Sequence, residues 1–136
     1  MESTARRSTR GKPIKCREEG ACKTLYVDEV KVASVLATMP APNEIEGIAD
    51  LFGVLSDPTR VRLLYALTRE ELCVCDLARV LGRSMPATSH QLQLLRRMHL
   101  VKYRMAGKLA YYSLDDARVK RLVQDAVRQS NAGRAA

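Results

Sequence analysis

Residues 71–98 decide the fold, and they read ELCVCDLARVLGRSMPATSHQLQLLRRM. A short helix is predicted to start near Cys75 and to end at Gly82, because glycine readily adopts the backbone conformation of a helix end. Its buried stripe is predicted to be Leu77, Val80 and Leu81. Two cysteines at the N-terminus of this helix, Cys73 and Cys75, are separated by a single residue.

A second helix is predicted directly after a tight turn. Ser84 is its expected N-cap, and the helix over about 85–98 is predicted to bury Leu92, Leu95 and Met98. The polar side chains left largely facing outward are Thr88, Ser89, Gln91 and Gln93. Two short helices joined by the turn at 82–84 are typical of a helix-turn-helix.

Apolar patterns on both sides complete the domain. The face of a helix over 44–56 is formed by Ile45, Ile48, Ala49, Phe52 and Leu55, and the next helix, capped by Asp57 and opened by Pro58, carries Val61, Leu63, Leu64 and Leu67. Val101, Tyr103 and Met105 alternate before a turn at 106–108, and the chain returns through 111–114, which indicates a β-hairpin. Arg60 is expected to be structural, near the helix-turn-helix core.

The C-terminal segment has a regular apolar stripe, formed by Val119, Leu122, Val123, Ala126 and Val127. Little of the chain remains to cover this stripe, so we expect it to pack against a partner subunit as well as its own core. The predicted fold class is mainly α with a small β-hairpin, a winged helix-turn-helix that forms a homodimer.

The N-terminal third has a different character. Residues 1–23 lack an apolar period and are interpreted as a mobile arm, residues 28–38 show a weak helical pattern, and Pro40 and Pro42 are expected to break the chain. We therefore divide the chain into 1–43, an arm with two cysteines and a short helix, and 44–136, a DNA-binding and dimerisation domain.

Composition narrows the function. The formal net charge is +8, which favours a nucleic-acid partner, although a solvated basic face is the alternative. No stretch approaches the about 18 apolar residues of a membrane span, and the N-terminus lacks an apolar signal core, so we expect a cytoplasmic protein with no membrane partner. No acid–base pair, glycine loop or nucleophile constellation points to an enzyme.

The four cysteines indicate soft-metal or redox chemistry. Thiolates select soft or borderline ions, and exposed amides at the helix entrance are expected to lower the pKa of Cys73 and Cys75. Two ligands are too few for a closed site, so Cys16 and Cys22 are expected to supply the remainder. The alternatives are that the pair is a set of small buried hydrophobes and that the arm thiols are idle.

Two polar sets are candidates for DNA contact. The helix over 85–98 and its cap supply Ser84, Thr88, Ser89, His90, Gln91 and Gln93, which can address phosphates or base edges, and Arg104 and Lys108 flank the hairpin tip. An ordinary polar face and a solvated hairpin are the alternatives. Neither His90 nor His99 is expected to bind metal.

Several motifs resemble the ArsR/SmtB family of winged-helix metal-sensing repressors. They are LSDPTR at 55–60, ELCVCDL at 71–77, SHQL at 89–92 and GKLAYYSL at 107–114. Within the family, the cysteine-bearing arm, the Cys-Val-Cys pair and YVDEVKV at 26–32 are most similar to the CadC-type cadmium and lead sensors. The resemblance covers roughly residues 44–130.

The resemblance implies a homodimer paired through its first and last helices. It also implies a site in which Cys73 and Cys75 of one protomer join Cys16 and Cys22 of the other. Cd(II) or Pb(II) is the implied effector, with Zn(II) or Bi(III) as alternatives, and its binding would release operator DNA. A thiol-based redox-sensing repressor and a constitutive DNA-binding protein with a structural metal are the rival functions.

The chain also departs from the family pattern. Of the family's second site on the C-terminal helices only Asp116 matches, because Arg118, Gln129 and Ala132 stand at the other positions, so no zinc site is expected there. Ala78 replaces a third cysteine of arsenic sensors, which weighs against As(III). His99 stands where the family has glycine, and a left-handed helix end there would cost about 1 kcal/mol.

Overall fold

The computed structural model describes residues 10–15 and 24–135, and its first unit ends at Gly47. Within that unit β1 (Arg10–Lys15) pairs antiparallel with β2 (Thr24–Asp28), and α1 (Glu29–Thr38) follows. The carboxylate of Asp28 accepts the Lys31 N–H at 3.2 Å and so caps the predicted helix. No strand was predicted within residues 1–23, and β1 is an addition to the interpretation of that segment as an arm. β1 itself has no apolar period. It forms because β2, which is rich in residues that favour strands, supplies it with backbone hydrogen-bond partners.

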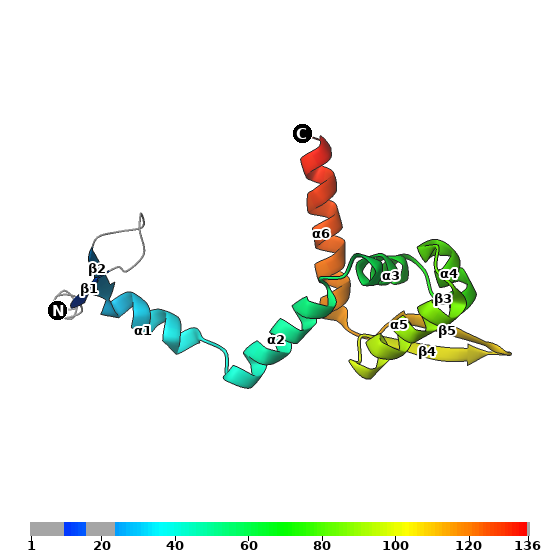
Figure 1. The fold of residues 1–136 in the computed structure, drawn as a ribbon, viewed down its shortest axis with the longest axis horizontal. Helices are drawn as coiled ribbons and strands as arrows, with labels where there is room; N and C mark the ends of the chain where they lie inside the picture. The colour runs from blue at the N-terminus through cyan, green and yellow to red at the C-terminus, as the bar shows by residue number, and fades with distance from the viewer. Residues whose placement is uncertain (1–9, 16–23, 136) are drawn as a thin grey trace. The chain divides into compact units, whose positions relative to one another are not determined.

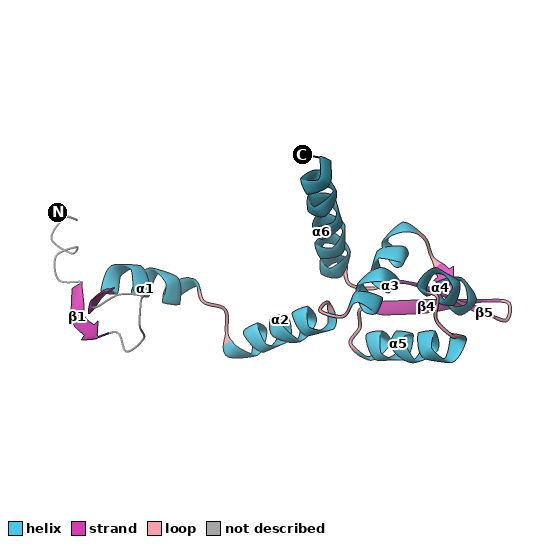
Figure 2. Cartoon of the chain, turned by 45° about the horizontal axis from the view of Figure 1, so that its top comes forward, coloured by secondary structure: helices cyan, strands magenta, loops and turns pink. Residues whose placement is uncertain are grey.

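The second unit, which starts at Ile48, contains the helix-turn-helix and the hairpin. Its elements, with α2 entering from the first unit, are α2 (Pro42–Val54), α3 (Pro58–Arg69), β3 (Leu72–Cys73), α4 (Val74–Leu81), α5 (Met85–Arg97), β4 (Val101–Ala106), β5 (Leu109–Leu114) and α6 (Ala117–Ala135). The β4–β5 hairpin extends beyond the helices as a wing (Figure 1). Figure 2 shows α5 running along one side of this hairpin.

The sheet of the second unit has three antiparallel strands in the order β3–β5–β4. The hairpin was predicted, but β3 was not. It is only two residues long, and Leu72 and Cys73 pair with Tyr112 and Tyr111 of β5. A strand this short has no period that a sequence pattern can reveal, and its partner lies almost forty residues away. The segment before α4 is consequently joined to the wing by main-chain hydrogen bonds.

An aliphatic core holds α3, α4, α5 and α6 together. Its fully buried side chains are Leu63, Leu64, Leu77, Leu92, Leu95, Val101 and Val119. Val80 and Met98, predicted to be buried, are 47% and 41% exposed. Val80 lies outside the buried face of α4, which is only eight residues long. Met98 is the C-cap residue and therefore follows the last helical residue of α5. The expected break at Pro40 and Pro42 is confirmed: α1 ends at Thr38, and Pro42 is the first residue of α2, where its missing N–H costs nothing.

Both helices of the helix-turn-helix end in the same backbone motif. After α4, Gly82 has φ +62° and the N–H groups of Gly82 and Arg83 donate to the carbonyls of Arg79 and Ala78 at 3.3 and 3.0 Å. After α5, His99 adopts φ +59°, and it is the one non-glycine residue with positive φ in the described part of the chain. The helix end at His99 is therefore left-handed, although no glycine stands there.

None of the helices in the described ranges is long and apolar enough to cross a membrane.

Candidate metal site and nucleic-acid interface

Cys73 occupies a junction between sheet and helix. It is the last residue of β3 and, with extended φ and ψ, the N-cap of α4. Its side chain is 6% exposed, and its Sγ donates to Asp76 Oδ2 at 3.2 Å while its backbone N–H reaches the same oxygen at 3.4 Å. The carboxylate of Asp76 therefore fixes both the main chain and the thiol at the start of α4.

The surroundings of Cys73 change its pKa in opposing directions. The backbone N–H of Asp76 is the largest influence and lowers the pKa, as expected for a thiol at a helix entrance. Burial, the hydrogen bond to the Asp76 carboxylate and the charges of Asp76 and Cys75 outweigh it, so the pKa of Cys73 is raised. The predicted lowering is wrong for this residue, because the sequence pattern did not reveal the acidic neighbour's orientation.

Cys75 has a different environment although it is only two residues away. It lies in the first turn of α4, its side chain is exposed, and its Sγ lies 3.8 Å from Sδ of Met85. Cys16 and Cys22, the other predicted ligands, lie outside the described residues. Within the described ranges, no three His, Cys, Asp or Glu side chains are grouped closely enough to hold a metal ion.

Glu71, two residues before Cys73, is bound to the wing. Its carboxylate accepts from Arg104 Nη2 at 2.6 Å and from Arg104 Nε at 3.0 Å on both oxygens. The hydrogen bond from Arg104 lowers the pKa of Glu71, and that guanidinium also lies 5.3 Å from the centre of the Tyr111 ring. Arg104, predicted to contact DNA, is thus held beside the cysteine segment by a bidentate pair.

The predicted DNA-contact residues of α5 divide into exposed and internal groups. His90 and Gln93 are exposed and Ser89 is half-buried. The Ser84 hydroxyl oxygen caps α5 by accepting the Ala87 N–H at 3.2 Å. Thr88 is only 1% exposed and donates its hydroxyl to the carbonyl of Ser84 at 2.9 Å, so the expectation that it faces outward is wrong.

Gln91 is oriented from within the domain. Arg60 of α3 donates from Nε to Gln91 Oε1 at 3.0 Å, and both side chains are half-buried. The contact uses one lone pair of the Gln91 amide oxygen and fixes the orientation of the amide group. Arg60, expected to be structural, thereby links α3 to α5.

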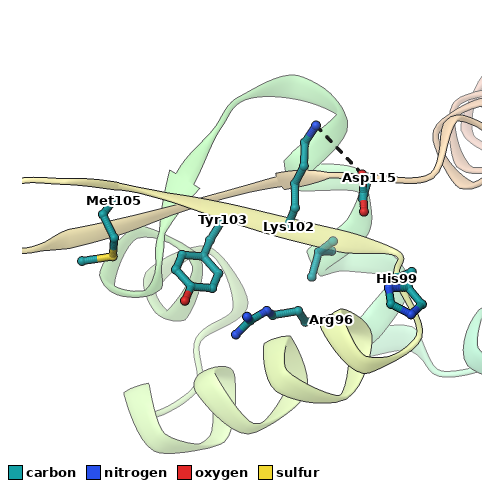
Figure 3. A pocket seen from close by; sticks show the side chains of 7 residues that line it. Arg96, His99, Lys102, Tyr103, Met105 and Asp115 are labelled. Atoms are coloured by element: carbon teal, nitrogen blue, oxygen red, sulfur yellow. Dashed lines mark ion pairs between the residues drawn. The ribbon is translucent and has the colours of Figure 1, made fainter.

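A basic hollow between α5 and β4 adds residues that the sequence reasoning missed. Its volume is about 530 Å³, and Arg96, His99, Lys102, Tyr103, Met105 and Asp115 are among the residues that line it (Figure 3). The Arg96 guanidinium lies 4.5 Å from the centre of the Tyr103 ring, which fixes α5 against the wing. The signal available in the sequence was the pair Arg96 and Arg97 in the exposed last turn of the helix.

At the positions of the family's second site, Asp116 is paired with Arg118. Its carboxylate accepts from Arg118 Nη2 at 2.8 Å and from the Arg118 backbone N–H at 2.8 Å. These hydrogen bonds lower the pKa of Asp116. The arginine therefore occupies the carboxylate that a metal would need.

A helix-turn-helix with a polar, basic second helix and a β-hairpin wing defines a winged-helix DNA-binding protein. Residues 57–103 match the family model described as bacterial regulatory protein, arsR family. The chain is also 44% identical over 106 residues to a cadmium resistance transcriptional regulatory protein CadC homolog of Staphylococcus aureus, covering 77% of this chain and 87% of the relative. The chain belongs to the ArsR/SmtB family of metal-sensing transcriptional repressors, which are regulators and not enzymes.

Solved structures agree with this assignment. The AntR antimony-specific transcriptional repressor superposes with a TM-score of 0.65 and 32% identity, over 71% of this chain and 87% of AntR. A homodimeric winged helix-turn-helix DNA-binding domain from Mycobacterium bovis superposes with a TM-score of 0.58 and 25% identity, over 71% and 90% of the two chains. The fold class predicted from the sequence, a winged helix-turn-helix that is mainly α, is confirmed.

Proposed function

We propose that this repressor binds operator DNA as a metal-free homodimer and releases it when a soft metal ion binds Cys73 and Cys75. The observation that carries the proposal is the position of the two thiols. Cys73 pairs with β5, and Cys75 lies in the first turn of α4, the helix that leads into α5. A change at these thiols therefore reaches both DNA-contacting elements of a winged helix.

The donor set fits a soft ion. A single residue separates the two thiols, and Cys75 is exposed. The S. aureus relative, which shares 44% identity, is named for cadmium resistance. We propose Cd(II) or Pb(II) as the effector, with Zn(II) or Bi(III) as weaker candidates, because thiolates prefer soft ions. Cys16 and Cys22 of the partner's arm are proposed to supply the remaining thiolates.

Glu71 is the proposed mechanical link between this site and the wing. Its bidentate pair with Arg104 fixes β4 to the residues just before Cys73. Movement of the cysteine segment therefore shifts an arginine on the wing, whose proposed role is to contact phosphate or the minor groove. The other proposed contacts are Ser84, Ser89, His90, Gln91, Gln93 and Lys108, while the buried Thr88 positions the helix.

An uncovered apolar groove supports the homodimer. Phe52 of α2 and Leu122 of α6 are 56% and 39% exposed, and they line a groove of about 340 Å³ with Leu55, Val61, Val123, Ala126 and Val127. A second copy covers this groove in the proposed dimer.

Leu122→Asp should yield a monomer in sedimentation velocity and weaken operator binding by at least tenfold, because a winged-helix dimer binds two half-sites.

Operator affinity measured by fluorescence anisotropy tests the central proposal. The full-length, fully reduced protein is titrated onto operator DNA under anaerobic conditions, with and without one Cd(II) per protomer. Thiolate-to-metal absorption is followed in parallel. We expect affinity to fall by about 5- to 150-fold as this absorption grows, which corresponds to a coupling of about 1–3 kcal/mol.

Cys75→Ser should abolish both the absorption and the loss of affinity. Alanine substitution of the exposed Arg128, near the end of α6, is a matched surface control that should leave both unchanged. If Cd(II) binds without changing affinity, the metal is structural. If a disulfide-forming oxidant releases DNA in the absence of metal, the redox function replaces the proposed one.

A further inference from the structure

The described cysteines have one close sulfur neighbour outside the Cys-Val-Cys pair. Sγ of Cys75 donates to Sδ of Met85 at 3.8 Å. Cys75 lies in the first turn of α4, and Met85 is the first residue of α5. The contact therefore joins the thiol segment to the start of the helix that reads DNA in winged-helix proteins.

The separation of the two sulfurs suits a shared metal ion. In a tetrahedral site with metal–sulfur bonds of about 2.3 Å, neighbouring sulfurs lie about 3.8 Å apart. The observed separation is also 3.8 Å. A larger soft ion widens this distance slightly, and the flexible Met85 side chain supplies the difference by rotation.

The backbones that carry the two sulfurs are held in place. The left-handed Gly82 ends α4, Ser84 caps α5, and Pro86 follows Met85 in the first turn of α5. These three features fix the turn between the helices, so little ordering remains when both sulfurs bind one ion.

Packing does not account for the contact. Met85 is 49% exposed and Cys75 is exposed, so neither side chain is part of the core. The contact between these two exposed side chains buries little apolar surface. Both sulfur atoms are soft donors on solvent-exposed residues, so a metal ion can reach them from solvent.

We propose that the Met85 thioether is a ligand of the soft metal ion bound by Cys75. The inference rests on the proposed function and adds a ligand from the same protomer. Binding removes the proton of the Cys75 thiol, while the thioether carries none, so Met85 adds affinity without adding a released proton. A thioether is a soft donor, and it therefore favours Cd(II) over the harder Zn(II).

The added ligand has a consequence for regulation. Because Met85 begins α5, an ion shared with Cys75 acts on the DNA-reading helix within one protomer. Some loss of operator affinity on Cd(II) binding should therefore persist when both arm cysteines are replaced by serine.

The direct test is NMR of full-length, reduced protein carrying ¹³C-methyl methionine and loaded with ¹¹³Cd. We expect one methionine methyl resonance to shift and to show scalar coupling to ¹¹³Cd. Met85→Leu, a substitution of similar volume, should remove that signal and lower Cd(II) affinity about tenfold in a competition titration, with a smaller effect on Zn(II). The number of protons released per Cd(II) should not change.

Met98→Leu is the matched control, because Met98 is also an exposed residue at an end of α5. It should retain the coupled resonance and the wild-type affinity, and thermal melts establish that both variants are folded. If Cys75→Ser loses Cd(II) but no methionine couples to ¹¹³Cd and Met85→Leu binds like wild type, the Met85 inference is wrong and the proposed function stands. If Cys75→Ser binds Cd(II) as wild type does, the proposed site is wrong, and the Met85 inference is wrong with it.

Discussion

Replacing His99 by glycine should stabilise this protein. His99 ends α5 with φ +59°, a conformation in which the Cβ of an L-residue crowds the backbone at a cost of about 1–2 kcal/mol. The N–H groups of His99 and Leu100 donate to the carbonyls of Arg96 and Leu95 at 2.9 and 3.0 Å, and Leu95 and Leu100 are both buried. The surrounding hydrogen bonds and packing thus hold the backbone in this strained state.

The expected increase in the free energy of unfolding is smaller than the backbone strain energy at His99. Glycine has more conformations to lose on folding, which costs about 0.4–1 kcal/mol. The net stabilisation from His99→Gly is therefore about 0.5–1 kcal/mol, or an increase in melting temperature of roughly 2–5 °C. Urea unfolding and thermal melts at one fixed protomer concentration measure it, because dimerisation makes the midpoint depend on concentration.

Two control variants separate backbone strain from loss of the imidazole. His99→Ala removes the ring but keeps the Cβ, so it should gain nothing. Gly82→Ala places a Cβ at the equivalent position after α4, where φ is +62°, and should destabilise by about 1 kcal/mol. Equal stabilisation by His99→Gly and His99→Ala would refute the explanation, as would a neutral His99→Gly.

Glu71→Gln removes the carboxylate that competes with phosphate for Arg104, so it should raise the apo protein's operator affinity about threefold and steepen its salt dependence by about one contact; an unchanged slope in anisotropy titrations would show that the Glu71 pair does not limit the contact of Arg104 with phosphate. Thr88→Val removes a buried hydroxyl that donates to a backbone carbonyl, so urea unfolding should show a loss of about 1 kcal/mol while the salt slope stays constant. Asp76→Asn removes the carboxylate that raises the pKa of Cys73. Because Cd(II) must displace the thiol proton, Cd(II) affinity rises with pH and levels off above the pKa of Cys73. In the variant, competition titrations should show that affinity levels off at a lower pH. A plateau at the wild-type pH would contradict the role of Asp76.

The features predicted from the sequence are those with local signals. Gly82, Ser84 and the spacing of Leu92 and Leu95 define the two helices, because caps and apolar period act within a few residues. The position of Thr88 was missed because a hydroxyl can be satisfied by the carbonyl four residues earlier, and an outward polar face is then unnecessary.

The unpredicted parts of the site depend on contacts between distant segments. Glu71 meets Arg104 across 33 residues, and Cys73 pairs with Tyr111 through a strand too short to show alternation. The Met85–Cys75 contact requires the exact turn between α4 and α5, which the sequence indicates only as a turn. The residue types were visible, but their partners were determined by the tertiary fold.

The segment 71–76 explains how a small ligand can affect DNA binding in the proposed switch. Within six residues it contacts β4 through Glu71, pairs with β5 through Cys73 and approaches α5 through Cys75. An ion that repositions the two thiols cannot do so without disturbing the wing, the recognition helix or both. Because such coupling is reciprocal, operator DNA must weaken metal binding by the same factor by which metal weakens operator binding. The strength of the switch therefore depends on how rigidly these three contacts hold in the metal-free protein.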